Sequence, residues 1–140
     1  MRKETEELLK VAAENPDLPI VAMVNSDVVW DGDGYWMASF SSVSVTEVGL
    51  VGERYYDDRD SFKEAYYDKY DDELTERFNY RPCLTLDNPR WGAATPEEIR
   101  ENEIAEARLE AYLEEMADQY MKKCIVVYVN EPDLSEWRNA

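Results

Sequence analysis

The residues of this chain that could do chemistry are above all its carboxylates. Asp and Glu number 32 against 15 Lys and Arg, the net charge is −17, and histidine is absent. Because histidine is the commonest general base and metal ligand, its absence excludes triad hydrolases of the usual kind and His-ligated zinc enzymes. Cys83 and Cys124 form neither a CxxC pair nor a zinc-ligand spacing.

Carboxylates alone can catalyse hydrolysis, but only in specific arrangements. A glycosidase needs two acids with separated pKa values in a cleft, and a two-metal nuclease needs acids clustered at strand ends. Asp57, Asp58 and Asp60 are the nearest candidates, yet they precede a predicted helix, whose positive end favours acids. We therefore expect a non-enzymatic protein without catalytic, cofactor-binding or metal-binding residues. A carboxylate hydrolase is kept as an alternative, and it would require metal-dependent turnover.

A second motif with chemical potential is the Asp-Gly-Asp-Gly run at residues 31–34. A calcium-binding loop needs ligands at alternate positions, one central glycine and a distal glutamate, and these are lacking. Asp and Gly between two apolar, aromatic stretches are typical of a hairpin turn. We expect the hairpin.

Most of the negative charge falls in two predicted helical segments. Residues 57–76 hold nine acids and three bases, and residues 97–118 hold nine acids and two bases. Such faces disfavour direct binding to nucleic acid or anionic membranes, and favour a basic protein partner. The acids predicted to form this partner-binding face are Asp68, Asp71, Asp72, Glu103, Glu106, Glu110, Glu114 and Asp118.

Periodicity and capping signals predict an α+β fold in a single domain over residues 1–140. We expect a mainly antiparallel sheet of three to five strands and three helices packed on one face of it. Thr95, Pro96, Glu97 and Glu98 are a strong helix start. Asp60 or Ser61 could cap the middle helix, with Glu64 placed to complete a capping box. The predicted helices are residues 4–14, 60–78 and 95–123. The predicted strands are residues 20–30, 35–40 and 124–129, together with residues 41–51, which form either a strand of their own or a continuation of the second.

The sequence also predicts a cellular compartment. Two lone cysteines are typical of a reducing interior. The amino-terminal residues contain no apolar core of a signal peptide, and no apolar run approaches the length of a membrane helix. We expect a cytoplasmic protein.

Residues 14–40, ENPDLPIVAMVNSDVVWDGDGYWMASF, resemble small acidic proteins carried by phages and prophages of Gram-positive bacteria. The acid-rich helical second half and the final IVVYV strand extend the resemblance loosely over most of the chain. It carries over no functional residues. It implies an anti-defence context in a host cell, such as that of anti-CRISPR and anti-restriction proteins that imitate DNA.

Charge and resemblance together give the leading hypothesis, a DNA mimic that blocks the nucleic-acid-binding cleft of a host RNA-guided nuclease. Acids one turn apart on a helix lie about 6 Å apart, too sparse to imitate a duplex alone. The hypothesis therefore requires the two acidic helices to lie side by side. The alternative is a structural or adaptor protein, possible also as a homodimer, that associates through an aromatic sheet face formed by Trp30, Tyr35, Trp36 and Phe40.

Overall fold

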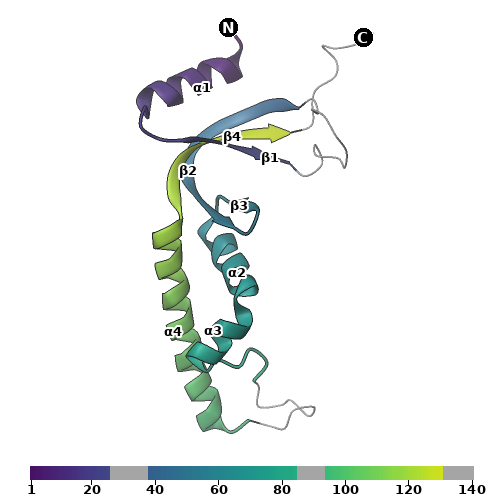
Figure 1. The fold of residues 1–140 in the computed structure, drawn as a ribbon, viewed down its shortest axis with the longest axis vertical. Helices are drawn as coiled ribbons and strands as arrows, with labels where there is room; N and C mark the ends of the chain where they lie inside the picture. The colour runs from purple at the N-terminus through teal and green to yellow at the C-terminus, as the bar shows by residue number, and fades with distance from the viewer. Residues whose placement is uncertain (26–37, 85–93, 131–140) are drawn as a thin grey trace, which may run out of the picture. The chain divides into compact units, whose positions relative to one another are not determined.

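The computed structural model describes residues 1–25, 38–84 and 94–130 (Figure 1). The chain forms two compact units, the first comprising Met1–Val48 and Lys122–Ala140 and the second comprising Gly49–Met121. The described elements are α1 (Lys3–Glu14), β1 (Ile20–Val24), β2 (Ser39–Val51), β3 (Arg54–Tyr56), α2 (Arg59–Lys69), α3 (Asp71–Phe78), α4 (Pro96–Tyr120) and β4 (Lys122–Asn130).

The first unit is built around β4, which lies between β1 and β2 (Figure 1). β1 runs parallel to β4, and β2 runs antiparallel to it with a register shift between Phe40 and Ser42. Cys124 and Val126 are buried and pack with Val48 into one core cluster. The unbroken apolarity of residues 124–129 is typical of a central strand, and β4 is paired on both of its edges.

The amino-terminal helix α1 ends where the sequence predicts a stop. The Asn15 backbone N–H donates to the Val11 and Ala12 carbonyls, and its side-chain amide donates to Val11 O at 3.0 Å. Pro16 then follows, and the residue before a proline avoids the helical region. The helix stops there, and β1 begins at Ile20.

The second unit begins with a tight hairpin in which the end of β2 pairs with β3. Gly49 pairs with Tyr56 and Val51 with Arg54, and Gly52 turns the chain with a φ of 63° that glycine adopts without strain. Gly49 allows a close approach, because a Cβ there would lie 2.5 Å from the Phe62 ring. The hairpin and α2 therefore depend on the missing side chain at Gly49.

The middle helix predicted over residues 60–78 is two helices. α2 ends at Tyr70, whose φ of −118° and ψ of 23° leave the helical region, and α3 follows directly. Aromatic residues spaced four apart drift round a helix of 3.6 residues per turn. The break at Tyr70 resets this drift, so that Leu74 packs against Leu109 and Leu113.

Helix starts in the second unit are set by side-chain caps. The predicted helix start at Thr95 is confirmed, and Thr95 and Glu98 form a capping box there. At α2 the cap is Asp58, which accepts hydrogen bonds from the backbone N–H groups of Asp60 and Ser61. The expectation that Asp60 or Ser61 caps this helix is wrong by two or three residues, because Asp58 is the residue that keeps an extended backbone.

α2 runs antiparallel to α4 within the second unit, and the short α3 packs against α4 further along (Figure 1). One core cluster joins Phe62 of α2 to Ala117 and Met121, and the other joins Leu74 of α3 to Leu109 and Leu113 of α4. Leu109, Leu113 and Ala117 are thus buried on the side of α4 that faces α2 and α3. This packing sets which carboxylates of the two acidic helices become neighbours.

The α+β class is confirmed, with four helices and a four-stranded sheet among the described residues. Several details differ from expectation. The break at Tyr70 adds a helix, and the parallel pairing of β1 with β4 makes the sheet mixed. Residues 39–51 form one strand, β3 is an additional strand, and the long helix ends at Tyr120 before β4 begins. The hairpin at residues 31–34 and the aromatic residues Trp30, Tyr35 and Trp36 lie outside the described residues. None of the described helices is long and apolar enough to cross a membrane.

The close approach at Gly49 gives a first prediction. Gly49→Ala should lower the free energy of unfolding by about 1–3 kcal/mol, because the new methyl group overlaps the Phe62 ring and the Met121 side chain. Gly52→Asn is the control: its site has no atom within 4 Å, and asparagine tolerates the left-handed region. Urea unfolding followed by circular dichroism measures both, and equal losses would contradict the packing explanation.

Candidate functional site: an acidic groove between two helices

A buried lysine joins the two acidic helices of the second unit. The Lys63 ammonium on α2 lies 2.6 Å from Glu110 Oε1 and 2.5 Å from Glu114 Oε1 on α4. The Lys63 side chain is only 11% exposed, and Asp60 lies 3.6 Å away on its own helix. Lys63 therefore sits between carboxylates of both helices and draws them together.

One turn towards the start of α2, an arginine makes a second link. Arg59 Nη2 donates to Glu114 Oε2 at 2.9 Å and to Asp118 Oδ1 at 2.5 Å. Glu114 thus receives a cation on each of its oxygens, Lys63 on one and Arg59 on the other. The two basic residues hold α2 and α4 in register over two turns.

These links change the ionisation of the groups involved. Hydrogen bonds from the Lys63 ammonium to Glu110 and Glu114 raise the pKa of Lys63. The same bond from Lys63, followed by that from Arg59, lowers the pKa of Glu114. Both directions favour the charged forms, so the links persist across the neutral range.

Beside Lys63, α2 and α4 leave a groove with a cavity of about 310 Å³. Leu109 and Leu113 supply its apolar part, and the half-buried rings of Tyr67 and Tyr80 supply its aromatic part. The charged side chains that line it are Asp60, Lys63, Glu64, Glu106 and Glu110. The groove is therefore apolar and aromatic within, and predominantly acidic at its margins.

The acids lie in two rows, one on each side of this groove. Asp60 and Glu64 line it from α2, and Glu106 and Glu110 line it from α4. Burial raises the pKa of Tyr67, and Tyr80, Asp71 and Asp68 add to the rise, so both acids lie near this ring. On the other side, burial and then Glu106 raise the pKa of Tyr80.

Of the eight predicted partner-binding acids, Glu106 and Glu110 line this groove. Glu110, Glu114 and Asp118 are turned towards α2 and paired there, although the sequence analysis placed them on an outward face. Their spacing of three and four residues places them on one side of α4, but it does not tell whether that side faces solvent or another helix. The other predicted acids make no ion pair within the described part of the chain: Asp68, Asp71, Asp72, Glu103 and Glu106.

Two of these acids lie at the edges of the arrangement. Asp72 is exposed in the first turn of α3, where its backbone N–H donates to Asp71 Oδ1 at 2.8 Å. Glu103 is exposed on α4, three residues before Glu106 and seven before Glu110, which places it on the same side of the helix. Glu103 therefore extends the α4 row, whereas Asp72 flanks the α3 end.

Sequence reasoning missed Arg59, Lys63 and the two tyrosines of the groove. It also left the lining acids Asp60 and Glu64 out of the partner-binding face. Arg59 and Lys63 are four residues apart, so they share one side of α2, and this spacing was the available signal. Tyr67 falls outside the four-residue aromatic stripe, and Tyr80 lies beyond α3. Their meeting depends on the fold of the segment after α3, which no local pattern predicts.

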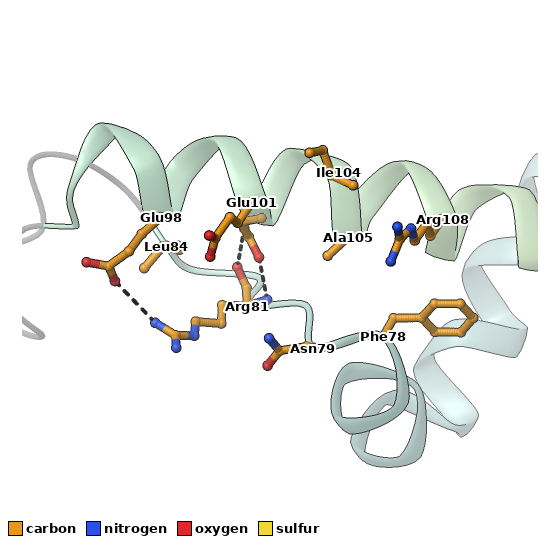
Figure 2. A pocket seen from close by; sticks show the side chains of 10 residues that line it. Phe78, Asn79, Arg81, Leu84, Glu98, Glu101, Ile104, Ala105 and Arg108 are labelled. Carbon is orange, nitrogen blue, oxygen red and sulfur yellow. Dashed lines mark hydrogen bonds and ion pairs between the residues drawn. The ribbon is translucent and has the colours of Figure 1, made fainter.

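A second hollow lies near the start of α4, where the segment after α3 passes it (Figure 2). Arg81 points towards Glu98, with 3.5 Å between their charged groups, and its backbone N–H donates to the Asn102 side chain at 2.8 Å. Arg108 adds a further cation to the lining. Because Arg81 and Arg108 balance Glu98 and Glu101 in its lining, this hollow lacks the excess of acids found in the groove beside Lys63.

The described residues hold no group of three or more Cys, Asp or Glu side chains placed to bind a metal ion. Comparisons with protein-family models, with curated proteins and with solved structures found no match. The function proposed for this site therefore depends on its own geometry and charge.

The role of the central lysine leads to a second prediction. Lys63→Met keeps the apolar stem but removes the cation between Glu110, Glu114 and Asp60, so we expect unfolding to become easier by about 1–2 kcal/mol. Lys69→Met, at an exposed position near the end of the same helix, should change stability by less than about 0.5 kcal/mol. If chemical denaturation gives the same loss for both variants, the interhelical link is not stabilising.

Acid titration provides a third prediction. Because the folded pKa of Glu114 lies below its ordinary value of 4.5, its ion pairs stabilise the fold above that pH and are lost as the pH falls through the lowered pKa. Glu114→Gln should therefore weaken the acid-induced loss of stability. Glu115→Gln, at the exposed neighbouring position, should leave that loss as in the parent. Thermal melting across the acidic range distinguishes the two, and parallel profiles for all three proteins would contradict the assignment.

Proposed function

We propose that the protein is a non-enzymatic inhibitor of the phage anti-defence kind, similar in action to anti-CRISPR proteins. In this proposal it imitates DNA and occupies the nucleic-acid-binding cleft of a host nuclease, with an RNA-guided effector as the expected target. The observation that carries the proposal is the pair of carboxylate rows on α2 and α4, which flank one groove in the second unit.

A cleft that binds the two phosphate rows of a duplex can also bind two rows of carboxylates. The Arg and Lys side chains of such a cleft form charge-assisted hydrogen bonds to carboxylates as well as to phosphates. RNA-guided nucleases hold their heteroduplex in a positive channel and read the adjacent motif with arginines. One acidic helix is too sparse for this role, but α2 and α4 lie side by side and present acids on both sides of a groove.

The internal ion pairs indicate which acids contribute most to such binding. Lys63 and Arg59 already neutralise much of the charge on Glu110, Glu114 and Asp118. The exposed acids without an ion pair in the described part of the chain keep their full charge for a partner, and they include Asp68, Asp71, Glu103 and Glu106. These residues, rather than the paired ones, are the expected contact points.

Charge reversal tests the proposal directly. The combined variant Asp68→Lys, Glu103→Lys and Glu106→Lys should weaken binding to the target by at least about 100-fold, because each reversal replaces a charge-assisted contact with repulsion. The matched control reverses Glu6, Glu7 and Glu14, which are exposed on α1 in the first unit, and it should bind like the parent. Circular dichroism confirms that both variants are folded.

The measurement is capture of basic nucleic-acid-binding proteins from a host lysate, followed by inhibition of DNA binding by the captured nuclease. Capture should fall steeply between about 0.1 M and about 1 M salt, because salt screens exposed charges. Capture that is indifferent to salt, or inhibition that survives the reversals on α2 and α4, would overturn the DNA-mimic proposal. Salt-independent self-association would instead favour the adaptor alternative.

A further inference from the structure

We propose that the groove between α2 and α4 receives an arginine side chain of the partner, with the guanidinium between the two acid rows and against Tyr67 and Tyr80. This inference rests on the proposed function and specifies how the basic partner is recognised. It concerns the aromatic and apolar interior of the groove, whereas the DNA-mimic proposal concerns only the charge at its margins.

The interior suits a long side chain with a flat cationic end. The cavity of about 310 Å³ is lined by Leu109 and Leu113, which can contact the methylene stem. Tyr67 and Tyr80 also line it, one from α2 and the other from the segment after α3. Aromatic faces attract cations within about 6 Å of the ring centre, and more strongly when water is excluded.

The charge of the groove complements a cation. Glu64 on the α2 side and Glu106 on the α4 side line the groove and make no ion pair with any described residue. The one cation of the lining, Lys63, is drawn to Glu110 and Glu114 at 2.6 and 2.5 Å. A guest cation would therefore meet uncompensated carboxylates on both sides.

Arginine fits this lining better than lysine. Its planar guanidinium stacks on aromatic rings, carries five donors and is less strongly hydrated than an ammonium group. The same unit already contains both kinds of contact. The Arg77 guanidinium lies 4.6 Å from the centre of the Tyr112 ring, and Arg59 bridges Glu114 and Asp118. A partner's arginine in the groove would combine contact with an aromatic ring and pairing with carboxylates in one site.

The test uses the full chain and three labelled peptides of equal length: oligo-arginine, oligo-lysine and oligo-citrulline. Fluorescence anisotropy should give the arginine peptide about fivefold tighter binding than the lysine peptide, and no measurable binding of the neutral citrulline peptide. Tyr67→Leu should remove the preference for arginine while leaving lysine binding unchanged. Tyr55→Leu, at an exposed position on β3, is the matched control and should preserve the preference.

Glu106→Gln provides a second variant that does not depend on the core, because Glu106 is exposed. It should weaken the arginine peptide several-fold, whereas Glu115→Gln on the same helix should not. Equal binding of arginine and lysine peptides would overturn the groove proposal and leave the DNA-mimic proposal intact. Citrulline binding as tight as arginine binding would also overturn it, since the occupant would then be apolar. Arginine-selective binding without any nuclease inhibition would support the groove and overturn the DNA-mimic function.

Discussion

The second unit depends on two cations placed between two acidic helices. Like charges a helical turn apart repel by roughly 1–3 kcal/mol at the effective dielectric constants of a protein surface. Burial of Phe62, Leu109 and Leu113 favours the close approach of α2 and α4, but it also brings their carboxylates together. Lys63 and Arg59 make the approach tolerable, because each lies between acids that would otherwise face one another.

This compensation is uneven along the helix pair. Arg59 and Lys63 lie in the first two turns of α2, opposite the carboxy-terminal half of α4. Further along, Asp68 and Asp71 on one side and Glu103 and Glu106 on the other have no ion pair in the described part of the chain. The carboxylates without an ion pair among the described residues therefore lie towards α3, as do Tyr67 and Tyr80. In the sequence both helices are acidic along their length. In the structure, Arg59 and Lys63 neutralise one end of the helix pair, and the other end keeps its charge.

Features of the fold that depend on a few neighbouring residues could be predicted from the sequence. Thr95 and Glu98 set the start of α4, and the apolar run of β4 set its central place. The parallel partner of β4 and the break at Tyr70 depend on contacts between segments distant in sequence, so neither could be predicted from a window of residues. The candidate site divides in the same way: the acid rows follow from helical spacing, whereas their pairing with Arg59 and Lys63 follows from tertiary packing.

That pairing bears on how an acidic surface could act as a decoy. Glutamate side chains lose conformational entropy when a partner fixes them, which reduces the affinity of each contact. Glu110 and Glu114 are already fixed by Lys63, so they contribute order rather than net charge. Glu103 and Glu106, on the same side of the same helix, keep their charge. The ion-paired end of the helix pair holds α2 and α4 in register and so fixes the position of the end that keeps its charge. In the proposed function, Glu110 and Glu114 therefore order the helices, whereas Glu103 and Glu106 contact the partner.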